Sequence, residues 1–123
     1  MEDLIQLRAF LEKNLLTLCP PLQVRKNEAR LFEVAGTKET MQGKQLVSGL
    51  YFASIIPKPK DVRFYFFPIY TNPEEFEWIS PAMKKCLKGK SCFHFKKLDY
   101  ELQNEFFKMI SHGVMLYGEK GLI

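Results

Sequence analysis

The sequence predicts an α+β fold, a two-layer sandwich in which a mainly antiparallel sheet packs against helices at the two ends of the chain. Apolar residues recur at helical spacing near both ends of the chain. Between them lie several short segments rich in aromatic and β-branched residues, and these are not separated by long helices as they would be in a parallel sheet. The length of 123 residues fits a single domain, 1–123.

Both terminal helices have recognisable boundaries. The first places Leu4, Leu7, Leu11, Leu15 and Leu18 on one face. Glu2 and Asp3 stand at its start, where the helix dipole favours negative charge, and Pro20 and Pro21 stop it because they cannot continue the hydrogen-bond ladder. Asp99 caps the closing helix, whose apolar stripe comprises Leu102, Phe106, Met109, Ile110, Gly113 and Tyr117.

Four or five strands are expected between these helices. Two short ones are 22–25 and 30–35, and the polar stretch after Gly36 is typical of a loop. Stronger strands at 49–56 and 62–70 are joined by PKPKD, which favours an antiparallel hairpin. Short helices then begin at Asn72-Pro73 and Ser80-Pro81, the second ending at Gly89, before a strand at 91–95.

The central hairpin predicts a sheet that is apolar on both faces. With Ile56 opposite Val62, the terminal helices can cover one face, and the chain's own loops, a ligand or another subunit must cover the second. That second face would carry Tyr51, Ala53, Ile55, Arg63, Tyr65, Phe67 and Ile69. Because amphipathic aromatic residues favour interfaces and ligand sites, the candidate contacts for a ligand or a homodimer partner are Tyr51, Arg63, Tyr65 and Phe67.

Basic residues are concentrated in one part of the chain. The formal net charge is +4, and the fourteen positions from 84 to 97 contain no Asp or Glu. The lysines in this stretch are Lys84, Lys85, Lys88, Lys90, Lys96 and Lys97. A basic patch attracts anionic partners, so Lys88 and Lys90 join the candidate site, with an anionic small molecule as one candidate partner. A solvated face is the plainer interpretation of the same lysines.

No catalytic or cofactor-binding motif is recognisable, so the sequence predicts a binding or interaction domain that is not an enzyme and needs no cofactor. The GKS at 89–91 lacks the glycine five positions earlier that a phosphate loop requires. Cys92 and His94 share one side of a strand and are weak metal-ligand candidates, because their spacing matches no familiar zinc pattern.

Nucleic-acid binding is a weaker hypothesis. The lysines could bind phosphates while Phe93, Phe95, Tyr51 or Tyr65 stack on bases. A buried strand face explains Phe93 and Phe95 better. The odd number of cysteines and the acidic start, unlike that of a signal peptide, predict a reduced, cytoplasmic protein. No apolar run approaches 18 residues, so no membrane-spanning helix is expected.

The aromatic strand VRFYFFPIY (62–70), the segment LKGKSCFHFKKLD (87–99) and the helix after them resemble the YdhG-like family of small bacterial domains of unknown function. The resemblance extends from Phe32 to the end of the chain and implies a compact α+β fold whose curved antiparallel sheet packs against terminal helices. Some relatives have been likened to frataxin, which would imply iron handling through an acidic surface. This chain departs from that pattern, since Glu2, Asp3 and Glu12 are offset by basic neighbours and are not clustered.

Overall fold

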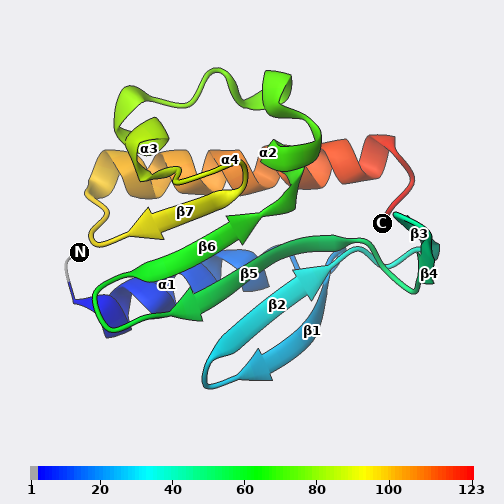
Figure 1. Ribbon diagram of the computed structural model, residues 1–123, viewed down its shortest axis with the longest axis horizontal. Coiled ribbons are helices and arrows are strands. Elements are labelled where there is room, and N and C mark those ends of the chain that lie inside the picture. Colours follow the sequence, from blue (N-terminus) through cyan, green and yellow to red (C-terminus); the bar gives the residue numbers. More distant parts are fainter. Residues whose placement is uncertain (1–2) are drawn as a thin grey trace.

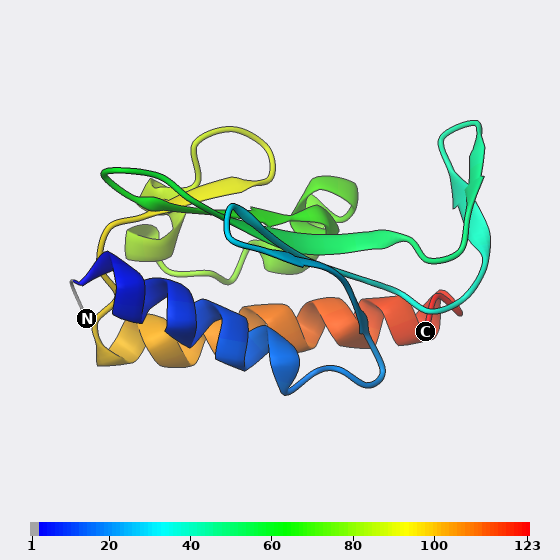
Figure 2. The same ribbon diagram turned by 90° about the horizontal axis from the view of Figure 1, so that it is seen from below.

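The computed structural model describes residues 3–123, which form two layers (Figures 1 and 2). One layer is a five-stranded antiparallel sheet with the strand order β1-β2-β5-β6-β7. Two long helices, α1 and α4, lie side by side on one face of this sheet, and no helix of the described chain covers the opposite face (Figure 2). The predicted α+β sandwich is therefore confirmed.

The elements follow one another along the chain in the predicted order of helix, strands, short helices, strand and helix. The strands are β1 (Gln23–Glu28), β2 (Leu31–Ala35), β3 (Thr40–Gln42), β4 (Gln45–Val47), β5 (Tyr51–Pro57), β6 (Val62–Phe66) and β7 (Cys92–Phe95). The helices are α1 (Leu4–Leu16), α2 (Phe67–Thr71), the 3-10 helix η1 (Pro73–Phe76), α3 (Pro81–Cys86) and α4 (Tyr100–Glu119).

The two long helices begin as the sequence predicts. Asp3 caps α1 and Asp99 caps α4, and each carboxylate accepts hydrogen bonds from N–H groups of the first turn. These bonds satisfy donors that have no partner within the helix. Glu2, also predicted at the start of α1, lies outside the described residues. The buried residues of the two helices are Leu7, Leu11, Leu15, Phe106, Met109, Ile110, Gly113, Leu116 and Tyr117.

Phenylalanine rings fill the space between the sheet and α4. Phe64 lies among them, with its ring centroid 4.9 Å from that of Phe106 and 5.6 Å from that of Phe66. Phe93 and Phe95 of β7 each lie 6.3 Å from it. All five side chains are fully buried. Edge-to-face and offset ring pairs are favourable beyond the area that they bury, so these contacts stabilise the packing of α4 on the sheet.

The predicted register between β5 and β6 is wrong by one residue. Ile56 lies opposite Arg63, and Val62 lies opposite Pro57. The connecting loop is residues 58–61, one residue shorter than the PKPKD connection assumed from the sequence. Because successive side chains of a strand point to opposite faces, a slip of one residue moves the side chains of one strand to the other face of the sheet.

This register gives the sheet one apolar face and one mixed face. Ala53 and Ile55, predicted for the second face, are fully buried on the face that the helices cover. A bulge at Phe52 in β5 keeps Tyr51 on the uncovered face, together with Tyr65. The prediction of a second apolar face that must be covered is therefore wrong.

The strand β6 ends at Phe66, four residues before the predicted end at position 70. Pro68 is the physical reason. A proline cannot donate to the strand ladder, but it fits the first turn of a helix, where its missing N–H would have no partner. The chain therefore enters α2, and Ile69, predicted for the sheet, is buried by the short helices.

Two glycines mark turns that differ from the prediction. The segment after Gly36 contains the hairpin of β3 and β4, which turns at Gly43 with a φ of 64° that favours glycine. The helix that follows Ser80 ends at Cys86. Gly89 is not its C-cap but lies in the turn before β7, with a φ of 128°.

Substitution of Gly113 should destabilise the fold by crowding the core. A Cβ atom at Gly113 would lie 2.8 Å from Cζ of Phe66 and 3.0 Å from Cζ of Phe52. We expect Gly113→Ala to lower the free energy of unfolding by about 1–3 kcal/mol in urea denaturation followed by circular dichroism.

Gly118 provides the matched control in the same helix, since the nearest atom to its added Cβ is Cδ1 of Ile123 at 4.0 Å. Gly118→Ala should be neutral or should raise the free energy of unfolding by up to about 1 kcal/mol, through helix propensity alone. Equal effects of the two substitutions would contradict the packing argument.

Candidate functional site

The strand register determines which side chains lie on the sheet face without a helix, which we call the open face. One row across β2, β5, β6 and β7 consists of Glu33, Ser54, Tyr65 and Cys92. The next row consists of Ile56, Arg63 and His94. Charged and hydroxyl-bearing groups therefore alternate with isolated apolar groups, as expected for a face that contacts water.

The structure brings the four sheet candidates from the sequence together. Tyr51, Arg63 and Tyr65 lie on the open face, and Phe67 begins α2 beside Tyr51, with ring centroids 5.7 Å apart. His94 lies directly opposite Arg63 in the neighbouring strand. These residues share a face, but they do not line a common cavity.

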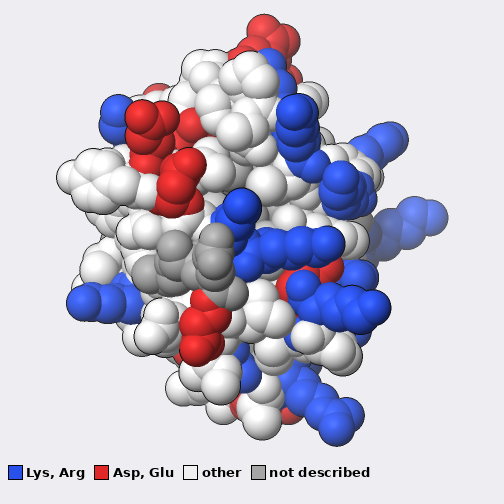
Figure 3. Space-filling view, turned by 90° about the vertical axis from the view of Figure 1, so that its left-hand side faces the viewer, with Lys and Arg blue, Asp and Glu red and all other residues white. Residues whose placement is uncertain are grey.

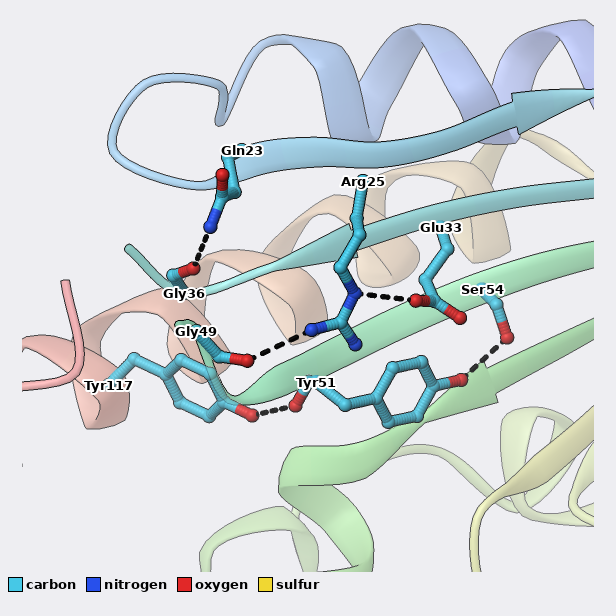
Figure 4. A network of polar contacts seen from close by, with 8 residues as sticks. All are labelled: Gln23, Arg25, Glu33, Gly36, Gly49, Tyr51, Ser54 and Tyr117. Carbon is cyan, nitrogen blue, oxygen red and sulfur yellow. Dashed lines mark hydrogen bonds and ion pairs between the residues drawn. The ribbon is translucent and has the colours of Figure 1, made fainter. Parts of the chain in front are cut away.

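Partly buried hydrogen bonds fix Tyr51 at one end of the open face (Figure 4). Its hydroxyl oxygen lies 2.5 Å from Oγ of Ser54. The Tyr117 hydroxyl of α4 donates to the backbone carbonyl of Tyr51. Burial raises the pKa of Tyr51 to about 12 and also raises the pKa of Tyr117 well above its usual value. Both hydroxyls therefore stay protonated at neutral pH and keep these hydrogen bonds.

The same view shows how the edge strand β1 is held (Figure 4). Arg25 Nε lies 2.7 Å from a carboxylate oxygen of Glu33, and its Nη1 donates to the Gly49 carbonyl at 3.0 Å. Gln23 Nε2 donates to the Gly36 carbonyl at 2.8 Å. These polar groups form hydrogen bonds with one another, so they are engaged within the fold at this end of the sheet.

The cysteine thiols are not activated. Burial raises the pKa of Cys92, and its hydrogen bond with Tyr65 is the main reason that the pKa of Tyr65 is also raised. Burial likewise raises the pKa values of Cys19 and Cys86. Because the thiolate is the nucleophile, a raised pKa keeps each of these groups in its unreactive form at neutral pH.

Asp61 is a buried carboxylate where the β5–β6 loop meets β6. Arg63 Nε donates to one of its oxygens at 3.3 Å, and Nδ1 of His94 lies 3.7 Å from the other. A buried carboxylate is tolerated only when it is paired, so Asp61 holds these two side chains in place. This role could not be predicted from the sequence, because aspartate is an ordinary loop residue and the pairing depends on the register.

A cavity of about 660 Å³ opens beside Asp61, and we call it the lysine cavity. Its lining comprises Asp61, Lys85, Cys86, Lys88, His94, Lys96, Lys97, Asp99 and Leu102. The four lysines come from the end of α3, the turn before β7 and the connection from β7 to α4. Basic side chains gather along one side of this end of the molecule (Figure 3).

The charges around the lysine cavity are unbalanced. Its two carboxylates have other partners, since Asp61 pairs with Arg63 and Asp99 caps α4. Among the residues that the structure describes, no ion pair involves any of the four lining lysines. Within residues 3–123 these four ammonium groups thus have no ion-pair partner, and the lining has a net formal charge of +2, from four lysines and two carboxylates with His94 counted as neutral.

The lysine-rich stretch does not form one site. Lys88 lines the lysine cavity, whereas Lys90 lines a second cavity of about 680 Å³ that we call the apolar cavity. Its lining comprises Ile69, Tyr70, Pro73, Phe76, Glu77, Ile79, Lys84, Leu87, Gly89 and Lys90. The segment from α3 to β7 thus separates the two cavities and contributes lysines to each.

Metal binding has little geometric basis within residues 3–123. No group of three or more His, Cys, Asp or Glu side chains that could hold a metal ion occurs there. The two described acidic candidates of the first helix have other roles, because Asp3 caps α1 and Glu12 pairs with Arg8. Cys92 and His94 contact Tyr65 and Asp61, respectively.

No protein-family model matches the chain, and no curated protein sequence or solved structure matches it significantly. The resemblance to the YdhG-like family therefore stays a prediction from the sequence. Within the described part of the chain, no helix combines the length and the hydropathy that crossing a bilayer requires.

The raised pKa of Tyr51 makes stability depend on alkaline pH. The neutral hydroxyl is favoured in the folded state, with a pKa of about 12, against about 10 in the unfolded chain. This contribution is complete below pH about 10 and is lost as the pH rises toward 12. We expect Tyr51→Phe to remove the step near pH 12 from the phenolate absorbance titration. The free energy of unfolding of this variant should also fall less between pH about 10 and pH 12.

Tyr100→Phe is the control, since this exposed ring of α4 has no part in the network. The titration step near pH 12 should persist in that variant. Loss of the step near pH 12 in Tyr100→Phe, or its persistence in Tyr51→Phe, would contradict the assignment.

Proposed function

We propose that the chain is a cytoplasmic, non-enzymatic binding domain for a small molecule that carries two or more phosphate or carboxylate groups, and that this ligand occupies the lysine cavity. The observation that carries the proposal is the set of four lysines around one cavity without an ion-pair partner among the described residues. Like charges held close together raise the free energy of the empty site, and a polyanion relieves that repulsion.

The surroundings of the cavity support a preformed site. Asp61 is buried, with one oxygen bound to Arg63 and the other 3.7 Å from Nδ1 of His94 at the wall of the cavity, and it forms no ion pair with a described lysine. A volume of about 660 Å³ is within the usual range for small-molecule sites. Lysine acts as a point charge on a flexible stem, which suits phosphate or carboxylate groups without demanding a fixed bidentate geometry.

The other functions considered from the sequence receive less support. The raised thiol pKa values argue against catalysis by a cysteine nucleophile, and three free cysteines suit a reducing compartment. A homodimer through an apolar second sheet face is less well supported, because the register places both polar and apolar side chains on that face. Nucleic-acid stacking on Phe93 or Phe95 is not supported either, since both rings are fully buried. Tyr51 and Tyr65 lie on the open face, but neither lines the lysine cavity.

Binding of inorganic triphosphate tests the proposal by isothermal titration calorimetry. A charge-assisted hydrogen bond contributes about 1.5–3 kcal/mol, so the double variant Lys85→Gln and Lys88→Gln should weaken binding about tenfold or more. Affinity for the wild type should also fall as salt rises from about 0.01 M to about 0.15 M, because added ions screen partly exposed charges. Citrate, measured in parallel, distinguishes carboxylate from phosphate preference.

The control removes the same charge from the region of the β3–β4 hairpin, through Lys38→Gln and Lys44→Gln. Both side chains are exposed and neither lines the lysine cavity. This variant should bind triphosphate within about twofold of the wild type. Equal losses in the two double variants would show that net charge alone attracts the anion, and no measurable binding of triphosphate or citrate to the wild type would overturn the proposal.

A further inference from the structure

The apolar cavity points to a second ligand of different chemistry. We propose that it binds a small molecule with an apolar body and a single anionic group, such as a medium-chain carboxylate. This site is distinct from the lysine cavity, and the proposal does not depend on the function proposed above.

The floor of the cavity is apolar and well buried. Ile69, Phe76 and Ile79 are 5%, 2% and 3% exposed, and they come from α2, η1 and the segment before α3. Leu87, after the end of α3, also belongs to the apolar lining. Four segments therefore line a space of about 680 Å³ that an apolar molecule can enter with little loss of hydrogen bonding.

The polar groups of the lining select an anion. Lys84 and Lys90 are exposed, and no ion pair involves either of them among residues 3–123. Glu77 is the acidic member of the lining, so two lysines and one carboxylate give a net formal charge of +1. This balance attracts one negative charge, whereas a ligand with several would also meet the repulsion of Glu77.

The turn at Gly89 leaves room for the anionic group. A Cβ atom at this position would meet no atom within 4 Å, and the φ of 128° is one that glycine adopts readily. Tyr70, whose side chain is 51% exposed, lies in the same lining and offers an aromatic surface and a hydroxyl near the solvent. An amphipathic ligand can thus bury its body against the floor while its charge stays near the two lysines.

The anionic dye 1-anilinonaphthalene-8-sulfonate is the probe, since it combines an aromatic body with one sulfonate. Its fluorescence should rise on binding the folded protein, and decanoate should displace it. Decanol has the same chain length without the charge and should compete at least about tenfold more weakly. Cross-peaks of Ile69 and Leu87 should shift in amide NMR spectra with decanoate, while those of His94 should not.

Variants of neighbouring lysines separate the two cavities. Lys84→Gln with Lys90→Gln should weaken dye binding about tenfold, whereas Lys85→Gln with Lys88→Gln removes the same charge from the lysine cavity and should change it less than twofold. Inorganic triphosphate should not displace the dye. Dye binding without triphosphate binding would overturn the proposed function and leave this inference standing.

Three results would overturn the inference itself. Equal effects of the two double variants, or displacement by triphosphate, would place the dye in the lysine cavity. Equal competition by decanol and decanoate would show that the lysines do not select an anion. Absence of both a fluorescence rise and shifts at Ile69 and Leu87 would show that the cavity holds no such ligand.

Discussion

The pairing of β5 with β6 is the constraint on which the rest of the structure depends. With Ile55 opposite Phe64, the phenylalanine side chains of β6 and β7 all point toward α1 and α4. A slip of β6 by one residue would expose Val62, Phe64 and Phe66 and would bury Arg63 and Tyr65 in their place. Each large apolar side chain contributes about 1.5–3 kcal/mol when buried, and a whole domain is stable by only about 5–15 kcal/mol. The slipped register is therefore excluded by the core, and the mixed character of the open face follows from the same pairing.

Local signals predicted the helices well, but they could not predict this register. Asp3, Ser80 and Asp99 cap helices through contacts that span three residues, so the sequence around each one was sufficient. The register instead depends on whether the β5–β6 loop has four or five residues. The loop is closed by a hydrogen bond from the N–H of Lys58 to the carbonyl of Asp61 at 2.9 Å. A loop of four residues and a loop of five residues both give an aromatic-rich hairpin, so composition alone does not distinguish the two registers. The end of β6, by contrast, could have been predicted, because Pro68 indicates that the strand stops before it.

The positive charge of the candidate site could be predicted from the sequence, but the shape of the site could not. Composition placed a basic stretch between positions 84 and 97, and four of its lysines do surround one cavity. The division between two cavities depends on where α3 ends and how the chain turns at Gly89. Lys84 and Lys85 are neighbours in the sequence, yet helical geometry directs them to different cavities, and Lys88 and Lys90 separate across the turn. Asp61 joins the site only through tertiary structure, since its partner His94 is on another strand.

Both cavities trace back to the way in which β6 ends. Had β6 continued through residue 70 as expected from the sequence, its last residues would have extended the sheet toward a longer β7. Because Pro68 diverts the chain into α2, residues 67–91 instead pack beside the sheet edge and along α4, where Ser80 N–H donates to Glu105 and His112 contacts Glu75. Short helices cannot fill such a space as evenly as a paired strand, since each ends after one or two turns. The cavities lie on either side of the α3–β7 connection for this reason, and the lysines of that connection give each cavity its positive charge.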